Sequence, residues 1–420
     1  MSAIDRLRAQ AEAVFARHGV PAPRLEHWKY TDIRRVVAPF IDHASPAASA
    51  EQGGVPNPLR DLDAYRVTFV DGRLVDGDTL PDGVRVRSLA AVLAEARGEE
   101  ASRLLAVDER APLFNGLVAL NAARACDGLV IDVADGVCVQ KPLYVLHWGA
   151  VGAAHPRHWI RLGRHAELTL IEHYLSDQEQ AGLTNGVTRL ELGAGAHARH
   201  VRLQQEARRR VHIGRLEARQ ARASSLVSHS IALGGAWSRV DIACTLADEA
   251  ARCRLDGLYL LAGRQHADHH TEIEHGAPFG VSREMYRGVL DGRARAVFNG
   301  RIVVREGAVK TDSAQRNANL LLSDRAEVDT KPELEIYNDD VQCAHGATVG
   351  QLDAQQLFYL RARGLSEEQA RQLLTFAFAD EVLAGIKPPE VRRYVERAAF
   401  GKLPQAGDIA SMLQQAGGAA

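Results

Sequence analysis

The sequence predicts a mainly β protein in which a strand-rich core lies between two helical ends. Short runs of alternating apolar and polar residues recur from Gly128 to His345, separated by corners rich in Gly, Asp and Ala. No long helical pattern interrupts these roughly 220 residues, which excludes a doubly wound sheet because that fold needs crossover helices. Helical spacing is confined to the ends. A sandwich, a large barrel and a parallel β-solenoid all stay open on these observations.

Residues 1–125 are predicted to form an N-terminal region of helices and mixed α/β structure. Apolar residues from Ile4 to Phe15 recur at helical spacing, and Gly19 followed by Pro21 is a common helix ending. Residues 44–58 are mostly Ala, Ser, Pro and Gly, which predicts a flexible linker. In residues 26–32, Trp28 and Tyr30 are expected to be packing anchors, because large aromatic side chains mainly contribute buried area.

Residues 126–350 are predicted to form the strand core. Leu129, Ile131 and Val133 alternate with other residues, and similar runs follow at 166–174, 188–192, 197–203, 225–232, 239–246 and 253–261. The pairs Asn185-Gly186 and Asn299-Gly300 are typical of antiparallel hairpins, whereas Gly-rich corners fit a coil equally well. The turn residues therefore do not decide between the three architectures.

Residues 351–420 are predicted to form a C-terminal helical domain. Asp353 with Gln356, and Ser366 with Gln369, have the spacing of helix-capping boxes. A third helix is expected from about 390 to 400, and the segment after Pro404 is expected to be a loose tail.

Composition excludes several classes of function. The 420 residues carry 51 basic and 53 acidic side chains, so the net charge of -2 gives no general attraction for nucleic acid. The five cysteines form no Cys-x-x-Cys pair, which disfavours a disulfide framework or a self-contained metal motif. Charges interrupt the first residues where a secretory signal needs an apolar core, and no run approaches the roughly 20 apolar residues of a membrane span. A cytoplasmic protein that binds no membrane is expected.

Signatures of the common enzyme mechanisms are missing from the sequence. Gly401-Lys402 is followed by Leu403 rather than Ser or Thr, so there is no phosphate-binding P-loop. Neither a Gly-x-Ser-x-Gly elbow nor a His-Glu-x-x-His zinc motif occurs. We therefore expect that this chain does not hydrolyse ATP by itself.

The densest group of possible metal ligands lies between His266 and His275. On a strand, His266, His270, Glu272 and Glu274 would share one face, while His269 and His275 would take the other. Because the ligands divide between two faces, a polar, solvated strand face is a better interpretation than a metal site.

Cys343 and His345 are a more informative pair. In an extended segment they are two residues apart and point to the same side, which places a thiol beside an imidazole. Zinc or an iron–sulfur cluster usually takes four protein ligands, so this pair supplies half of a coordination sphere. The alternative is that Cys343 is a small buried hydrophobic residue and His345 a turn residue.

Several short segments form a distinctive series along the sequence. They are Trp28-Lys29-Tyr30-Thr31-Asp32, Lys310-Thr311-Asp312, Leu320-Leu321-Leu322-Ser323, Pro332-Glu333-Leu334-Glu335-Ile336, Asp339-Asp340-Val341, Cys343-Ala344-His345-Gly346-Ala347-Thr348 and Leu357-Phe358-Tyr359-Leu360 through Arg363-Gly364. In order and spacing these segments resemble the SufB/SufD family of the SUF iron–sulfur cluster assembly system, and within it the SufD branch. SufB proteins typically carry His-Glu-Ala-Thr where this chain has His345-Gly346-Ala347-Thr348, and they lack the preceding cysteine.

The resemblance implies a fold and a role. It implies a right-handed parallel β-helix core, a heterodimer with SufB through the β-helix ends, and docking of the ATPase SufC on the C-terminal helices. It further implies a non-catalytic scaffold in which His345, with Cys343 beside it, contributes to a transient iron–sulfur cluster that is shared with SufB and is not held by the chain alone. A homodimer of the isolated chain is compatible with this role.

The resemblance also suggests which residues meet the ATPase. Those on the first C-terminal helix are the candidates, and for Phe358 the alternative is plain helix core. The predicted docking residues are Phe358, Tyr359, Arg361, Arg363 and Gly364.

Two other classes of function remain as alternatives. A β-helix carbohydrate-active enzyme would use a groove of charged residues along the solenoid, and such enzymes are generally secreted. A homodimeric metal-binding subunit would keep iron and sulfide in stoichiometric amount without a partner.

Overall fold

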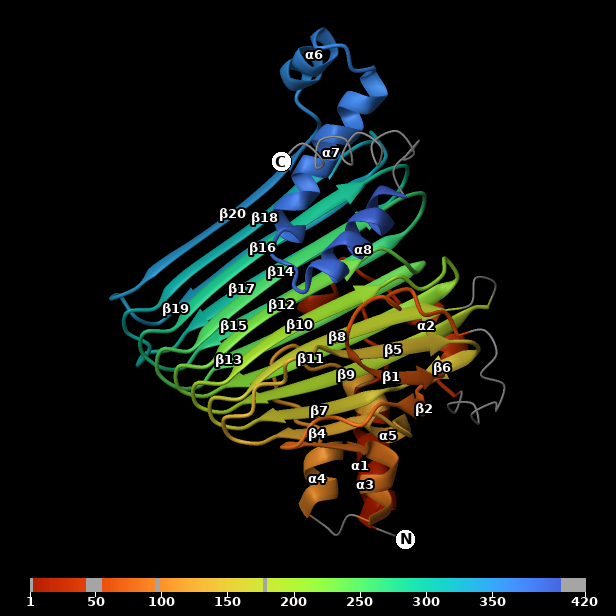
Figure 1. The fold of residues 1–420 in the computed structure, drawn as a ribbon, viewed down its shortest axis with the longest axis vertical. Coiled ribbons are helices and arrows are strands. Elements are labelled where there is room, and N and C mark those ends of the chain that lie inside the picture. The colour runs from red at the N-terminus through yellow and green to blue at the C-terminus, as the bar shows by residue number, and fades with distance from the viewer. Residues whose placement is uncertain (1–2, 43–54, 96–98, 177–179, 402–420) are drawn as a thin grey trace.

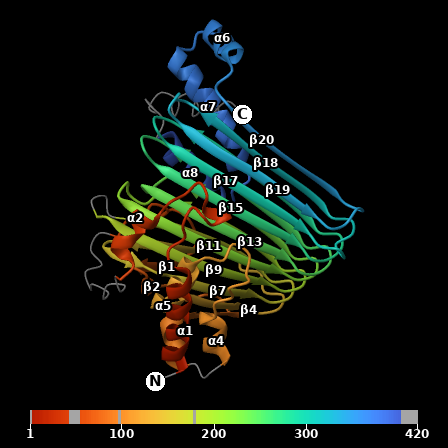
Figure 2. The same ribbon diagram turned by 180° about the vertical axis from the view of Figure 1, so that it is seen from behind.

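Strands alternate between two facing sheets, so that the backbone winds as a solenoid (Figures 1 and 2). The structure is a computed structural model that describes residues 3–42, 55–95, 99–176 and 180–401. Most strands pair in parallel with one about 30 residues further along the chain, which is typical of solenoid turns. This confirms the parallel β-helix core with helices at both ends, and excludes the sandwich and the closed barrel.

The two sheets, named A and B, contain the strands of the solenoid in spatial order. Sheet A consists of β2 (Arg73–Gly77), β1 (Tyr65–Val70), β5 (Leu143–Gly149), β8 (Glu167–Ser176), β10 (His197–Gln204), β12 (Ser225–Ala232), β14 (Arg252–Leu261), β16 (Val281–Leu290), β18 (Asp312–Leu321) and β20 (Gln342–Gly350). Sheet B consists of β19 (Glu327–Ile336), β17 (Arg295–Val304), β15 (His266–His275), β13 (Trp237–Leu246), β11 (Arg210–Gln220), β9 (Gly182–Leu192), β7 (Arg157–Leu162), β4 (Leu129–Val133) and β3 (Val84–Ser88), with β6 (Gly152–Ala154) beside β9.

Helices flank the sheets at both ends of the chain. They are α1 (Ala3–His18), η1 (Glu26–Trp28), α2 (Arg34–Val37), η2 (Ala38–Phe40), α3 (Leu89–Glu95), α4 (Glu99–Leu105), α5 (Gly116–Arg124), α6 (Ala354–Ala362), α7 (Glu367–Leu383) and α8 (Pro389–Phe400). Within the described ranges, no helix combines the length and the hydropathy needed to cross a bilayer. Most of the predicted linker at 44–58 and the whole tail after Pro404 lie outside the described residues. The division at residues 125/126 and 350/351 stays a prediction.

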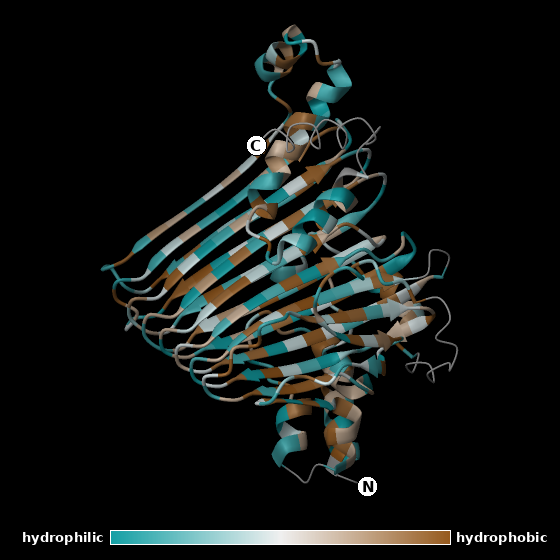
Figure 3. Cartoon of the chain, in the orientation of Figure 1, coloured by the Kyte–Doolittle hydropathy of each residue, from teal (hydrophilic) through white to brown (hydrophobic). Residues whose placement is uncertain are grey.

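The interior of the solenoid has an apolar half and a polar half. Alternation along each strand turns every second side chain inward, and Figure 3 shows the resulting change of hydropathy along the strands. Leu168, Leu190 and Leu216 belong to the apolar cluster. Further along the inward positions of β8 and β10, Glu172 and Arg202 are each about 1% exposed and form an ion pair of 3.1 Å. Burying such charges is tolerated only when they are paired and hydrogen-bonded.

The C-terminal helices α7 and α8 cover part of the outer face of sheet A (Figure 1). Val382 and Val395 of these helices pack against apolar side chains of the sheet, including Leu203 and Leu258. The Tyr394 hydroxyl also donates a hydrogen bond of 2.7 Å to Gln205 Oε1 at the end of β10. Helix α7 is therefore fixed to the sheet at its C-terminal half.

The N-terminal segment covers part of the outer face of sheet B. Trp28 is 2% exposed, and the Arg239 guanidinium lies 3.7 Å from the centre of its ring. Arg239 pairs with Asp268 at 2.6 Å, and Thr31 Oγ1 donates to the same carboxylate at 2.6 Å. The predicted packing role of Trp28 is confirmed, and a cation–π contact strengthens it.

The solenoid stops at β19 and β20. In the described structure β19 pairs only with β17, and β20 pairs only with β18, so each has one free edge. Both strands are half-buried or exposed along their whole length, unlike the strands of the preceding turns. A free strand edge offers unpaired N–H and C=O groups to another chain.

Candidate functional site

Cys343 and His345 lie on β20, in line with the interior of the solenoid. In the parallel register, Cys343 pairs with Ser313 and His345 with Gln315, whose side chains are buried inside. Because in-register parallel strands place equivalent side chains above one another, both residues face the same side, as their spacing predicts. His345 lies within a strand and is exposed, so the interpretation as a turn residue is wrong.

The two candidate ligands differ in their surroundings. Cys343 is half-buried and packs against Ile302, Val304 and Ala308. Burial raises the pKa of its thiol, and the negative charge of Asp312 adds to this effect. Because the thiolate is the form that binds metal, a raised pKa makes Cys343 the weaker ligand. His345, in contrast, is exposed at this end of the solenoid.

Large exposed apolar side chains gather at the same end. Ile336 and Tyr337, at the end of β19, are 40% and 55% exposed, and Val349 of β20 is 48% exposed. Free edges together with exposed apolar side chains mark a surface for association with another protein.

The histidine-rich strand β15 is a structural element. Its residues divide between the two faces as predicted, with His269 inside and His266 and His270 outside. The outer face is not solvated, however, because the N-terminal segment buries it, and in this respect the prediction was wrong. Burial lowers the pKa of His266 to about 4, so its ring is neutral at pH 7.

Asp268 is the centre of this buried network. Burial alone would raise the pKa of its carboxyl, but Arg239 and His270 together hold the pKa well below its usual range. Arg239, His270 and Thr31 all contact this carboxylate, which pairs the buried charge within the protein and makes it part of a structural network.

One group of buried side chains in the described structure has the spacing of a metal site. Ligand atoms of His147, His158 and Glu172 lie within 4.8 Å of one another in the solenoid interior. Glu172 already accepts hydrogen bonds from Tyr174 and Thr188 and is paired with His200 and Arg202. His158 Nδ1 accepts from the backbone N–H of Leu129 at 3.0 Å, so the proton of its neutral ring is on Nε2, where a metal would have to bind. The group is a polar core rather than an open metal site.

A second buried carboxyl lies two turns below His345. Glu284 of β16 is 3% exposed, and Gln315 of β18 donates a hydrogen bond of 2.6 Å from Nε2 to Glu284 Oε2. Burial raises the pKa of Glu284 to about 7, and hydrogen bonding with Thr271 and Gln315 offsets only part of this shift. Polar residues at inward strand positions are the sequence signal that could have identified Glu284 and Gln315.

The raised pKa of Glu284 predicts a pH dependence of stability. The folded chain keeps the proton up to pH 7, whereas the unfolded chain releases it near the ordinary value of 4.5. The free energy of unfolding should therefore fall as the pH rises from 4.5 to 7, by about 3 kcal/mol from this group. Glu284→Gln removes the ionisation. The free energy of unfolding of this variant, measured in urea and taken relative to that of the wild type, should therefore rise by this amount between pH 4.5 and 8. The exposed Glu191→Gln is the control, and equal slopes for all three proteins would contradict the expectation.

Helix α6 projects from the body of the molecule (Figures 1 and 2). Phe358 is 74% exposed and Tyr359 is 57% exposed, and no residue of α6 is buried. The interpretation of Phe358 as helix core is therefore wrong. Arg363 donates to the Tyr359 hydroxyl at 2.9 Å, and Arg361 lies 3.5 Å from Glu367 of α7.

Gly364 makes the turn between α6 and α7. Its φ of +96° is a conformation that other residues rarely adopt. This turn sets the direction of α6 relative to α7, so the structure brings all five predicted docking residues onto one projecting element.

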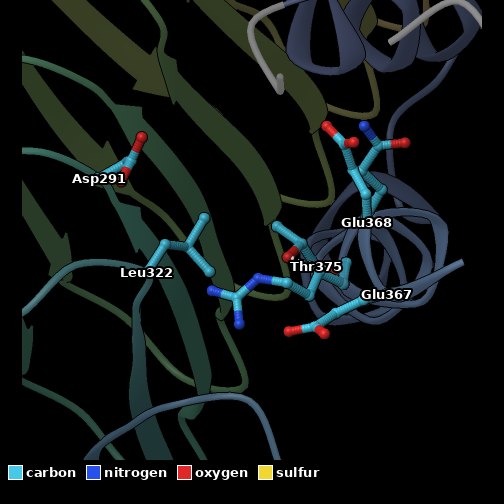
Figure 4. A pocket seen from close by; sticks show the side chains of 7 residues that line it. Asp291, Leu322, Glu367, Glu368 and Thr375 are labelled. Carbon is cyan, nitrogen blue, oxygen red and sulfur yellow. Dashed lines mark hydrogen bonds between the residues drawn. The ribbon is translucent and has the colours of Figure 1, made fainter. Parts of the chain in front are cut away.

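A cavity of about 350 Å³ lies beside the first turns of α7 (Figure 4). Asp291 and Leu322, at the ends of β16 and β18, line one side, and Glu367, Glu368 and Thr375 of α7 line the other. Three carboxylates give this cavity a net negative charge against Arg371 alone. Sequence analysis missed it, because the residues from the strand ends and from the helix lie far apart in the chain.

Comparison with protein families identifies the class of protein. Residues 146–378 match the family described as "SUF system FeS cluster assembly, SufBD core domain", and residues 1–145 match "SufBD protein N-terminal region". Together these matches cover most of the chain, so the chain belongs to the SufBD family of iron–sulfur cluster assembly proteins.

Three relatives are similar to this chain over most of its length. The chain is 34% identical over 400 residues to the iron–sulfur cluster assembly protein SufD of Escherichia coli, covering 92% of this chain and 90% of the relative. It is 31% identical over 382 residues to a SufBD family protein of Synechocystis, covering 87% and 83%. It is also 26% identical over 404 residues to the chloroplastic protein ABCI7 of Arabidopsis thaliana, covering 93% and 84%.

Proposed function

We propose that this chain is a non-catalytic scaffold subunit of iron–sulfur cluster assembly that pairs with SufB through the β19/β20 end of its solenoid. The observation that carries the proposal is the position of His345, which is exposed on the last turn with Cys343 beside it. In this arrangement SufB covers the free edges of β19 and β20 and brings further ligands to His345.

The number of ligands explains why the cluster is transient and shared. An iron–sulfur cluster usually takes four protein ligands, and the end of β20 offers one imidazole and one thiol of raised pKa. A site with this donor set holds iron weakly until a partner completes it. The chain alone is therefore expected to keep no stoichiometric iron and sulfide, in contrast to a self-sufficient metal-binding subunit.

The ATPase SufC docks on α6 in this proposal. Exposed aromatic side chains with arginines beside them are typical of the residues that dominate binding energy at protein interfaces. ATP binding and hydrolysis belong to SufC, which agrees with the missing P-loop, and the complex works in the cytoplasm. When SufB is absent, the same free strand edges allow two copies of this chain to pair.

A path of direct contacts connects the docking helix with the cluster site. Helix α7 begins beside α6, and its second half packs on β14 and β16. Glu381 of α7 forms an ion pair with Arg287 of β16, and the Arg287 guanidinium lies 4.8 Å from the centre of the Phe378 ring. Strand β16 pairs with β18, and β18 pairs with β20. ATP can drive a change at His345 only if one arrangement of this path binds SufC–ATP better than another.

Removing the exposed aromatics of α6 should weaken SufC binding. The double variant Phe358→Ala/Tyr359→Ala is expected to lose about 2 kcal/mol of binding free energy or more, because large aromatic anchors dominate such interfaces. The measurement is calorimetric titration of the purified chain with SufC. Phe279→Ala is the matched control, since Phe279 is 54% exposed at a corner of the solenoid away from α6. Equal affinities for the double variant and the control would remove α6 from the docking surface.

The whole proposal is tested by co-expression with SufB and SufC. We expect the three proteins to purify as one complex that accepts iron and sulfide, while the chain alone retains neither. A lone chain that keeps a stable cluster, or that cleaves acidic glycans, would overturn the scaffold function.

A further inference from the structure

Gln315 lies directly below His345 on the inner side of the solenoid. The two residues are register partners on β18 and β20, and adjacent strands are about 4.8 Å apart. Gln315 is 1% exposed, and its Oε1 is buried without a hydrogen-bond partner in the described structure. A buried acceptor that lacks a partner is unfavourable, so a donor is expected to approach it.

The orientation of the Gln315 amide group is fixed by the contacts of its nitrogen, Nε2. Its Nε2 donates to Glu284 Oε2 at 2.6 Å, and above pH 7, where the Glu284 carboxyl is ionised, this carboxylate can only accept. The same nitrogen lies over Gly300 of the facing sheet, where an added Cβ would be 1.7 Å away, so Gly300 leaves the room that the amide group needs. The amide nitrogen is held by Glu284, and the amide oxygen is left as an acceptor.

A histidine that binds metal through one ring nitrogen usually donates the N–H of the other to an acceptor, which fixes the tautomer and the direction of the ring. The His345 side chain makes no hydrogen bond or ion pair with the described residues. Its register partner on the neighbouring strand, which faces the same interior, is Gln315. Its unpartnered oxygen is the acceptor that such a histidine requires.

We propose that Gln315 is a positioning residue for His345: its Oε1 accepts the ring N–H of His345, and Glu284 holds the amide in the orientation that makes this possible. The ring nitrogen that carries no proton then faces outward, toward the iron. This inference rests on the proposed function of His345 as a ligand, and it assigns the tautomer in which that ligand is presented.

The test is the tautomer of His345 in the full chain. Nitrogen NMR of protein labelled with ¹⁵N-histidine distinguishes one fixed neutral tautomer from an exchanging mixture, and the His345 signal is identified by its loss in His345→Ala. At pH 8.5 the wild type should show one protonated ring nitrogen. Gln315→Met, which keeps the length of the side chain but removes the acceptor, should show a mixture.

Two further variants separate positioning from a general disturbance of the fold. Ser313 is a buried residue on β18, the strand of Gln315, and it is the register partner of Cys343. Ser313→Ala should leave the His345 tautomer fixed. Glu284→Gln keeps a hydrogen bond to Gln315 but allows either orientation of the two amides, so it should give a mixture even if Gln315→Met does not fold.

The functional readout is iron binding by the complex with SufB and SufC. Gln315→Met should lower the apparent iron affinity by about 10- to 100-fold, as is usual when the partner of a ligating histidine is removed. A mixed tautomer in the wild type, or a fixed tautomer in both Gln315→Met and Glu284→Gln, would overturn this inference. An unchanged cluster in His345→Ala would instead overturn the proposed function, whatever the NMR result.

Discussion

His345→Ala is expected to leave the proposed complex with SufB and SufC assembled and to reduce its iron and acid-labile sulfide at least ten-fold. The substitution removes the imidazole at an exposed position of β20, where no packing depends on it. Loss of a ligand costs more than the 10- to 100-fold loss of metal affinity that follows removal of a residue behind the ligand. The measurement is the iron and sulfide content of the purified complex together with its visible absorption.

His197→Ala is the matched control for this experiment. His197 is also an exposed histidine on a strand of sheet A, but it lies in the middle of the solenoid. Its substitution should leave the cluster content unchanged. Cys343→Ser should have a smaller effect than His345→Ala, because the Cys343 thiol has a raised pKa and packs against Ile302. A cluster yield in His345→Ala that equals the control would remove His345 from the site.

Glu172→Leu is expected to destabilise the isolated chain by about 3–5 kcal/mol, the cost of leaving a buried charge without its partner. The Glu172 carboxylate lies 3.1 Å from Arg202 and 2.7 Å from His200, and all three side chains are nearly inaccessible to water. Leucine fills most of the volume but leaves the Arg202 guanidinium unpaired. Urea unfolding followed by circular dichroism measures the loss.

Two variants show whether the loss comes from the unpaired charge. Glu172→Leu/Arg202→Met removes both charges and should recover much of the stability, because an apolar pair can replace a buried ion pair. Glu249→Ala breaks the surface pair with Arg222, whose side chains are 47% and 68% exposed, and should cost less than about 1 kcal/mol. If Glu172→Leu were as stable as Glu249→Ala, the interior would tolerate the unpaired charge of Arg202, contrary to this expectation.

The strands and the terminal helices could be predicted from sequence because alternation and helical spacing are local properties. The choice of a solenoid could not, since its turns differ slightly in length: His197 pairs with Ser225, whereas Val281 pairs with Asp312. Without one exact period, the repeat is hidden in the sequence. The resemblance of the motifs to a known family supplied the architecture that the pattern left open.

Which strand faces are covered was also beyond the sequence. The sequence pattern of β15 predicts a solvated outer face. In the structure this face is buried by Trp28 and Thr31, which lie more than two hundred residues earlier in the chain. In the opposite sense, Phe358 has the pattern of a helix core and is exposed, because α6 has no sheet beneath it. Such long-range coverage is a tertiary property that local periodicity does not contain.

The same-side placement of Cys343 and His345 followed from their spacing alone. Their place on the terminal turn required the fold, because only the strand order shows that β20 has no successor in sheet A. The column formed by Glu284, Gln315 and His345 also depends on register, which couples residues about 30 apart along a solenoid.

The free edge of β20 has a consequence for dynamics. In a solenoid each coil is stabilised mainly by the coils next to it, and the last coil has a neighbour on one side only. Its backbone amides should exchange with deuterated water sooner than those of β10 or β12, which are flanked on both sides. The candidate iron ligands thus lie on a terminal coil that should open more readily than the inner coils, and a second subunit that pairs with this edge would stabilise the coil and fix the ligands in place in the same step.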